Sequence, residues 1–149
     1  MSFGQILKDS YGLKEDDLSK AINLQKDLGG DIGRILVQTG SITERQLVEA
    51  LSRYLNIPLF QGEWVADEAL VTYLSERLNY DFLIRNRLLP TKIDHVEKTL
   101  YAATSDPFNY TVSDYVVGAL GYTVQLSLAT EQTITDLSRD FIQDISTSH

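Results

Sequence analysis

Residues 30–51, GDIGRILVQTGSITERQLVEAL, have the pattern of a short helix, a turn and a longer helix. Gly40 can adopt a positive φ where the short helix ends. Thr43, followed three residues later by Gln46, forms a capping box at the start of the longer helix. That helix has one apolar face at helical spacing, made of Leu47, Ala50, Leu51 and Leu55. The stretch therefore predicts a helix-turn-helix unit.

The same pattern occurs once before it in the chain, and Gly4 recurs as Gly33, 29 positions later. Four further pairs have the same offset: Ile6 and Ile35, Leu7 and Leu36, Leu18 and Leu47, and Ala21 and Ala50. We call residues 1–27 the first copy and residues 30–56 the second copy. Together they predict a four-helix subdomain over residues 1–56.

The first copy has weaker local signals than the second. Tyr11 stands at the position of the turn glycine, although Gly12 can supply the turn one residue later. Lys14 stands at the capping position, and its side chain has no oxygen to accept a backbone N–H. We therefore expect the first copy to be the less stable and more mobile half of the repeat.

Residues 57–149 predict a second subdomain, because Pro58 has no N–H to extend a helix and biases Ile57 toward extended structure. Asp67 can cap a helix that continues to Leu78. Short strands are expected at residues 82–84, 88–90, 99–104 and 122–128, and a final helix after Thr130. Between the last two strands, one helical face carries Val112, Tyr115, Val116 and Ala119.

The fold class expected for the whole chain is α+β. A tandem helix-turn-helix repeat is expected to pack on a two-layer α/β unit that has a mainly antiparallel sheet.

Composition argues against several classes of partner. The 149 residues carry a net charge of -8, whereas binding to phosphate backbones or anionic membranes favours the opposite sign. The chain has no cysteine, which agrees with a reducing compartment. It has neither a signal-peptide pattern nor an apolar run near the roughly 20 residues that span a bilayer. We therefore expect a cytoplasmic protein.

The common catalytic patterns are absent from the sequence. There is no G-x-x-x-x-G-K-[ST] phosphate loop and no G-x-S-x-G nucleophile elbow. His95 and His149 are the only histidines, so neither a catalytic triad nor a zinc site is expected. Gly29, Gly30 and Gly33 follow no strand and fit a helix end and turn. We expect no enzyme activity in this chain, no metal and no cofactor.

Three features in this order carry a resemblance to a known family: the two copies, Asn56-Ile57-Pro58-Leu59, and Ser105-Asp106-Pro107. The chain resembles the N-terminal domain of type II secretion ATPases, the general secretory pathway protein E family, and of their type IV pilus assembly relatives. The resemblance implies a docking domain ahead of an ATPase motor in the full-length chain. It also implies binding to the cytoplasmic domain of an inner-membrane platform protein, and hence a peripheral location at the inner membrane.

A second function is open, because some domains of this family bind cyclic di-GMP on the tandem repeat. Their repeat begins Arg-Leu-Gly, whereas this chain has Ser2 and Asp31 at the two arginine positions. The final glutamine of the motif is kept as Gln25 and is replaced by Tyr54. If the ligand binds, the resemblance assigns it Gly4, Ile6, Leu7, Gln25, Gly33, Arg34, Ile35 and Leu36.

Five residues are candidates for contact with a protein partner: Leu47, Leu51, Trp64, Arg85 and Arg87. The single tryptophan, Trp64, fits either an interface hot spot or a lid on the core. Arg77, Arg85, Arg87 and Lys92 concentrate positive charge in an acidic chain, either as a contact surface or as a solvated face. We expect docking to depend on release of the first copy from the second, controlled by the nucleotide state of the motor.

Overall fold

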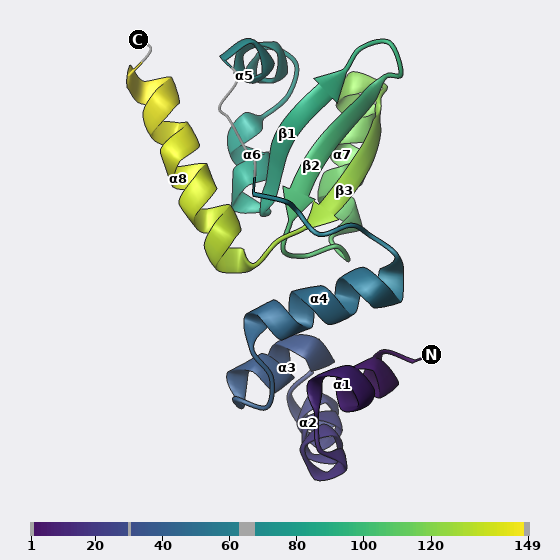
Figure 1. Cartoon of the computed structure of the whole chain (residues 1–149). Helices are drawn as coiled ribbons and strands as arrows, with labels where there is room; N and C mark the ends of the chain where they lie inside the picture. The colour runs from purple at the N-terminus through teal and green to yellow at the C-terminus, as the bar shows by residue number, and fades with distance from the viewer. Residues whose placement is uncertain (1, 30, 63–67, 148–149) are drawn as a thin grey trace. The chain divides into compact units, whose positions relative to one another are not determined.

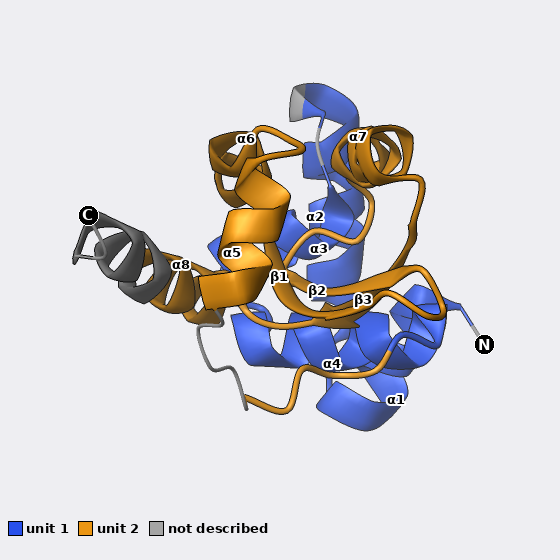
Figure 2. Ribbon diagram, turned by 90° about the horizontal axis from the view of Figure 1, so that it is seen from above, with its two compact units in different colours: residues 1–57 blue, residues 58–149 orange. Residues whose placement is uncertain are grey.

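The computed structural model describes residues 2–29, 31–62 and 68–147, and it describes side chains as far as Arg139 except that of Leu28. The chain divides into two compact units, residues 1–57 and residues 58–149 (Figure 2). The first unit is helical, and the second combines helices with a sheet (Figure 1).

The first unit consists of α1 (Phe3–Tyr11), α2 (Glu15–Leu28), α3 (Ile32–Gln38) and α4 (Glu44–Leu55). Helix α1 packs against α4, and α2 packs against α3. Apolar residues from every helix and from the turns form its core: Ile6, Leu7, Leu13, Ala21, Leu36, Ile42, Leu47, Val48, Ala50 and Leu51.

The second copy has the local structure that its sequence predicts. The Thr43 hydroxyl accepts a hydrogen bond from the Gln46 backbone N–H at 3.1 Å, and the Gln46 side chain accepts one from the Thr43 N–H at 2.9 Å. Gly40 has φ +77° in the turn after α3. Asn56 ends α4 in the left-handed conformation. The capping box and the glycine turn are therefore confirmed.

The first copy differs from its prediction at one end. As expected, Lys14 makes no side-chain capping bond to α2, and Gly12 supplies the left-handed residue after α1. However, α1 begins with a complete capping box, in which the Ser2 hydroxyl accepts from the Gln5 N–H at 3.2 Å. The Ser-x-x-Gln spacing was available in the sequence, so the weak capping is confined to α2.

The second unit contains α5 (Glu68–Ser75), α6 (Tyr80–Arg85), β1 (Leu88–Asp94), β2 (Thr99–Thr104), α7 (Tyr110–Leu120), β3 (Thr123–Leu128) and α8 (Glu131–Thr147). The strands are ordered β1-β2-β3 in one sheet. Strands β1 and β2 form an antiparallel hairpin, and β3 pairs parallel to β2 after the crossover through α7. The α+β class is confirmed, but the sheet is mixed rather than mainly antiparallel, because a helical crossover returns the chain in the same direction.

One local prediction in this unit is wrong. Residues 82–84 belong to helix α6, not to a strand. The Asn79 side chain caps that helix by accepting from the Phe82 N–H at 3.1 Å, and Tyr80 and Leu83 bury one helical face. On the predicted helical face of α7, Val112 and Val116 are buried, Tyr115 is half-buried and Ala119 is exposed. Short apolar runs do not distinguish a strand from a short helix. The expected cap at Asp67 lies outside the described residues.

Helices cover the sheet unequally. Leu88, Leu100 and Ala102 point to one face and pack in a core with residues of α5, α6 and α7, as the two-layer prediction requires. Leu89 and Ala103 point to the opposite face and pack with Ile134 of α8. Helix α8 therefore covers part of the second face, which the two-layer prediction did not include.

Candidate functional site

Each copy in the first unit has a glycine where its short helix meets its long helix. A Cβ atom built on Gly33 of α3 would lie 2.5 Å from Leu47 Cδ1 of α4. A Cβ atom on Gly4 of α1 would lie 3.3 Å from Leu18 Cδ2 of α2. Both glycines thus permit close approach of two helices, and this packing explains them without a ligand.

The two positions that carry arginine in cyclic di-GMP-binding repeats are helix caps in this chain. Ser2 is the N-cap of α1, and Asp31 is the N-cap of α3. The Asp31 carboxylate accepts a hydrogen bond from the Gly33 N–H at 3.0 Å. A helix N-terminus is a favourable place for an anion, and here the protein supplies that anion itself.

The residues predicted for a nucleotide ligand differ in accessibility. The side chains of Ile6, Leu7 and Leu36 are buried in the core of the unit. Gln25, Arg34 and Ile35 are half-buried, so only these three could reach a ligand through their side chains in this conformation. Gly4 and Gly33 could contribute backbone atoms only.

The first copy packs on the second through two helix pairs, α1 with α4 and α2 with α3, and side-chain contacts are seen between α1 and α4. The Phe3 and Tyr54 rings have centroids 5.8 Å apart, and the Arg53 guanidinium donates to the Ser10 hydroxyl. Burial raises the pKa of the Tyr11 hydroxyl, and the nearby Glu49 carboxylate raises it further. These contacts lie at the partly exposed edge of a unit whose core is apolar, and the sequence patterns gave no signal for these cross-helix pairs.

The candidate protein-contact residues fall into three groups. Leu47 and Leu51 are buried in the first unit, so they can meet a partner only after that unit opens. Trp64 lies outside the described residues. Arg85 pairs with Asp81 at 2.8 Å, and Arg87 pairs with Glu131 of α8 at 2.6 Å.

The four cations predicted as one patch are divided between different surroundings. The Arg77 guanidinium lies 3.8 Å from the centroid of the Tyr73 ring in α5, and the Lys92 ammonium lies 5.3 Å from that of Tyr101. Arg85 and Arg87 instead line a cleft with Arg139, which is absent from the predicted set. Only packing of α8 beside α6 brings these arginines together, so no spacing in the sequence indicates the cluster.

The described residues hold no group of three histidine or acidic side chains that could bind a metal ion. His95 is exposed, and its Nδ1 atom lies 2.9 Å from the Tyr122 hydroxyl. Within the described parts of the chain, no helix has the length and apolar character needed to cross a bilayer.

Comparison with known proteins identifies the family. The model of the MshEN domain matches residues 55–146, which is more than half of the chain. The chain belongs to the MshEN domain family. This confirms the resemblance to N-terminal domains of secretion and pilus-assembly ATPases. The match covers most of the second unit, and the family model says nothing of the two copies in the first.

Solved structures extend the likeness over nearly the whole chain. A structure of MshE with cdg has a TM-score of 0.76 and 25% identity, and the alignment covers 95% of this chain and 99% of that one. The N-terminal domain of XpsE has a TM-score of 0.69 and 23% identity in one crystal form, over 91% and 90% of the two chains. A second crystal form has a TM-score of 0.58 and 26% identity. A search of curated protein sequences found no match.

This MshEN domain thus shares the fold of the XpsE N-terminal domain, and no ATPase domain is evident in the sequence.

Proposed function

We propose that this MshEN domain docks a secretion ATPase onto the cytoplasmic domain of an inner-membrane platform protein. In this proposal the domain is cytoplasmic, lies at the inner membrane only through its partner, and precedes the ATPase motor in a longer chain. The tandem copies act as the coupling element. Membership of the MshEN family and the fold shared with the XpsE N-terminal domain support the proposal.

The observation that favours docking over ligand sensing is the Asp31 cap. Its carboxylate already binds the N-terminus of α3 through the Gly33 N–H at 3.0 Å. A phosphate placed there would meet a negative charge instead of an arginine. The repulsion between these two partly exposed groups would cost about 1 kcal/mol or more of binding free energy. It would also lack the paired donors of a guanidinium group.

Binding of cyclic di-GMP is the second candidate function, and one comparison favours it. The structure of MshE with cdg aligns with 95% of this chain. The side chains of Gln25 and Arg34 are half-buried, so the exposed part of each could contact such a ligand. The two candidates differ in a measurable way, because one requires a protein partner and the other a nucleotide.

The docking mechanism follows from the interface between α1 and α4. Its ring contact and its Arg53–Ser10 hydrogen bond are partly exposed, and α2 lacks a side-chain cap. Exposed polar contacts of this kind contribute little net stability. Release of the first copy would uncover apolar residues of the second, including Leu47 and Leu51, for a protein partner.

Calorimetric titration tests the proposed function. The chain is titrated with the cytoplasmic domain of the platform protein and, separately, with cyclic di-GMP and with ATP. Docking predicts a dissociation constant in the micromolar range or below for the protein and no heat from either nucleotide. Tight binding of cyclic di-GMP without binding of the protein would establish the sensor function instead.

A pair of tyrosine variants tests whether release of the first copy permits docking. Tyr54 of α4 has 48% of its surface exposed, and Tyr110 of α7 has 65% exposed. Tyr54→Ala should tighten platform binding, because it removes the ring contact with Phe3 that helps to hold the first copy against the second. Tyr110→Ala is the matched control and should bind like the unmodified chain. Equal or weaker binding by the Tyr54 variant would contradict docking through release of the first copy.

A further inference from the structure

We propose that the cleft between α6 and α8 binds a small phosphorylated molecule, at a site separate from the helical copies. The described residues lining the cleft are Ile84, Arg85, Arg87, Ile134, Thr135, Ser138 and Arg139. All of them belong to the second unit. The cleft has a volume of about 410 Å³, within the range of small-molecule sites.

The charge of the cleft opposes that of the chain. Three arginines line it in a protein of net charge -8. Among the described residues, two carboxylates face these arginines, Asp81 on Arg85 and Glu131 on Arg87. Both ion pairs are partly exposed and therefore weak, and each uses the Nε atom of a guanidinium that has five N–H donors. The remaining donors suit the oxygens of a phosphate.

A buried hydroxyl gives the second, independent indication. Ser138 is only 6% exposed, and its Oγ atom has no hydrogen-bond partner among the described residues. Buried polar groups are almost always hydrogen-bonded, and an exception calls for an explanation. Ser138 lines the cleft, but its Oγ atom is itself buried, so the side chain has to turn toward the cleft before a phosphate oxygen can accept its proton. A buried hydroxyl without a partner costs stability, and a ligand that pairs with it removes that cost.

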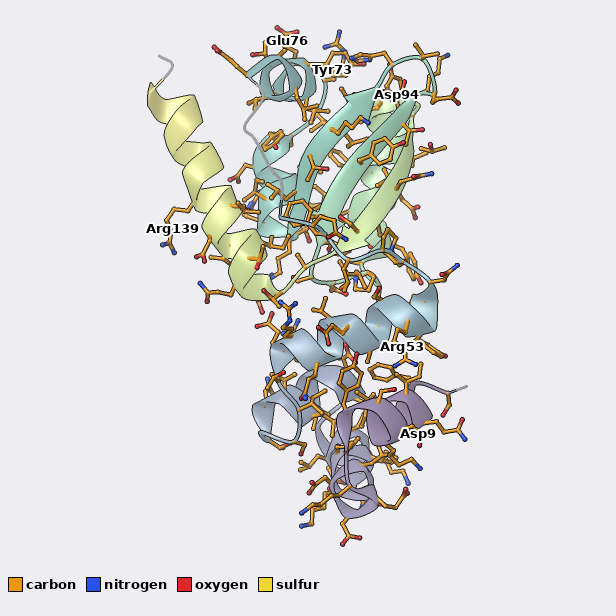
Figure 3. The ribbon with its side chains drawn as sticks, viewed as in Figure 1. Asp9, Arg53, Tyr73, Glu76, Asp94 and Arg139 are labelled. Carbon is orange, nitrogen blue, oxygen red and sulfur yellow. The ribbon has the colours of Figure 1, made fainter. Side chains whose placement is uncertain are left out.

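The remaining lining residues indicate the size and character of the ligand. Ile84 and Ile134 provide an apolar wall beside the arginines. The Arg139 side chain extends from α8 into solvent, on the side away from α6 in this view, so it would have to turn to contact an anion in the cleft (Figure 3). An acidic peptide resting on the rim would pair with the arginines but would not reach Ser138. The enclosed hydroxyl therefore favours a small ligand over a protein surface.

Titration with inorganic pyrophosphate tests the proposal without the platform protein, so its outcome is independent of the docking function. Calorimetry should show saturable binding at one site, and NMR shifts should map it to α6 and α8. Arg85→Gln and Arg139→Gln should each raise the dissociation constant about tenfold. Ser138→Ala should raise it roughly threefold while leaving the ligand-free melting temperature unchanged or higher.

Arg45→Gln is the matched control, because Arg45 is an exposed arginine of α4 that also pairs with a carboxylate, Glu49. It should leave pyrophosphate binding unchanged. Absence of saturable binding overturns the proposal, as does equal weakening by Arg45→Gln. Loss of platform binding in the Arg85 and Arg139 variants, with no pyrophosphate binding by the unmodified chain, would show that the cleft contacts protein instead.

Discussion

Gly33 of α3 is in contact with Leu47 of α4, because a Cβ atom on this glycine would lie 2.5 Å from the leucine Cδ1 atom. The equivalent pair in the first copy, Gly4 and Leu18, is less tight at 3.3 Å. Close helix packing thus depends on a missing side chain in both copies and depends on it more strongly in the second.

Substitution of these glycines should destabilise the first unit more where the added Cβ atom would lie closer to the leucine of the neighbouring helix. Gly33→Ala should lower the free energy of unfolding by about 1–3 kcal/mol, as overpacking of a core does. Gly4→Ala should cost less, since a few tenths of an ångström of movement relieves it. Gly118→Ala is the control, because Gly118 lies in α7 with open space around it and should gain about 0.5–1 kcal/mol. Urea denaturation measures all three, and equal losses would contradict the packing role.

Helix caps should decide the relative stability of the copies. Thr43→Ala removes the capping box of α4 and should cost about 0.5–2 kcal/mol. Lys14→Ser supplies the missing acceptor at the start of α2 and should stabilise the unit by up to roughly 1 kcal/mol. Hydrogen exchange should show weaker protection of residues 1–27 than of the second copy, and Lys14→Ser should reduce the difference. Equal protection in the unmodified chain would rule out selective release of the first copy.

Arginine introduced at positions 2 and 31 should create affinity for cyclic di-GMP. A double variant, Ser2→Arg with Asp31→Arg, should bind at least tenfold more tightly than the unmodified chain, because it replaces repulsion with guanidinium contacts. It should also lose stability through loss of both caps. Asp31→Asn is the control, since asparagine caps as well as aspartate and removes only the charge. If the unmodified chain binds as tightly as the double variant, Asp31 does not exclude the ligand.

Tyr80 should make the protein sensitive to alkaline pH. Its side chain is buried, and burial raises the pKa of its hydroxyl far above the ordinary value near 10. Above about pH 10 the unfolded chain releases this proton and the folded chain keeps it, so the free energy of unfolding falls by about 1.4 kcal/mol per pH unit. Below that pH the group has no such effect.

Denaturation of Tyr80→Phe between pH 8 and 11.5 tests this, and the variant should lose stability less steeply than the unmodified chain. Tyr110→Phe removes a hydroxyl from an exposed ring and should follow the unmodified chain. Identical slopes for all three proteins would show that Tyr80 ionises in the folded state.

Local patterns determined much of the fold from sequence alone. The Thr43 capping box and the Gly40 turn depend on residues close together in the chain, so their chemistry is visible there. The same reasoning failed at residues 82–84, where a short apolar run fits a strand or a helix. The Asn79 side chain caps α6, and this cap stabilises the helix over a strand.

Arrangements that join distant residues were decided only by the tertiary structure. The direction of β3 depends on the crossover through α7, and the cleft depends on α8 bringing Ser138 and Arg139 beside Arg85. The sequence by itself determined the α+β class and most helices of the first unit, because caps, turns and apolar periodicity act over a few residues, and three motifs in order carried the resemblance to the family. Strand direction and convergence of charge are set by packing between segments far apart in sequence, so only the folded chain reveals them.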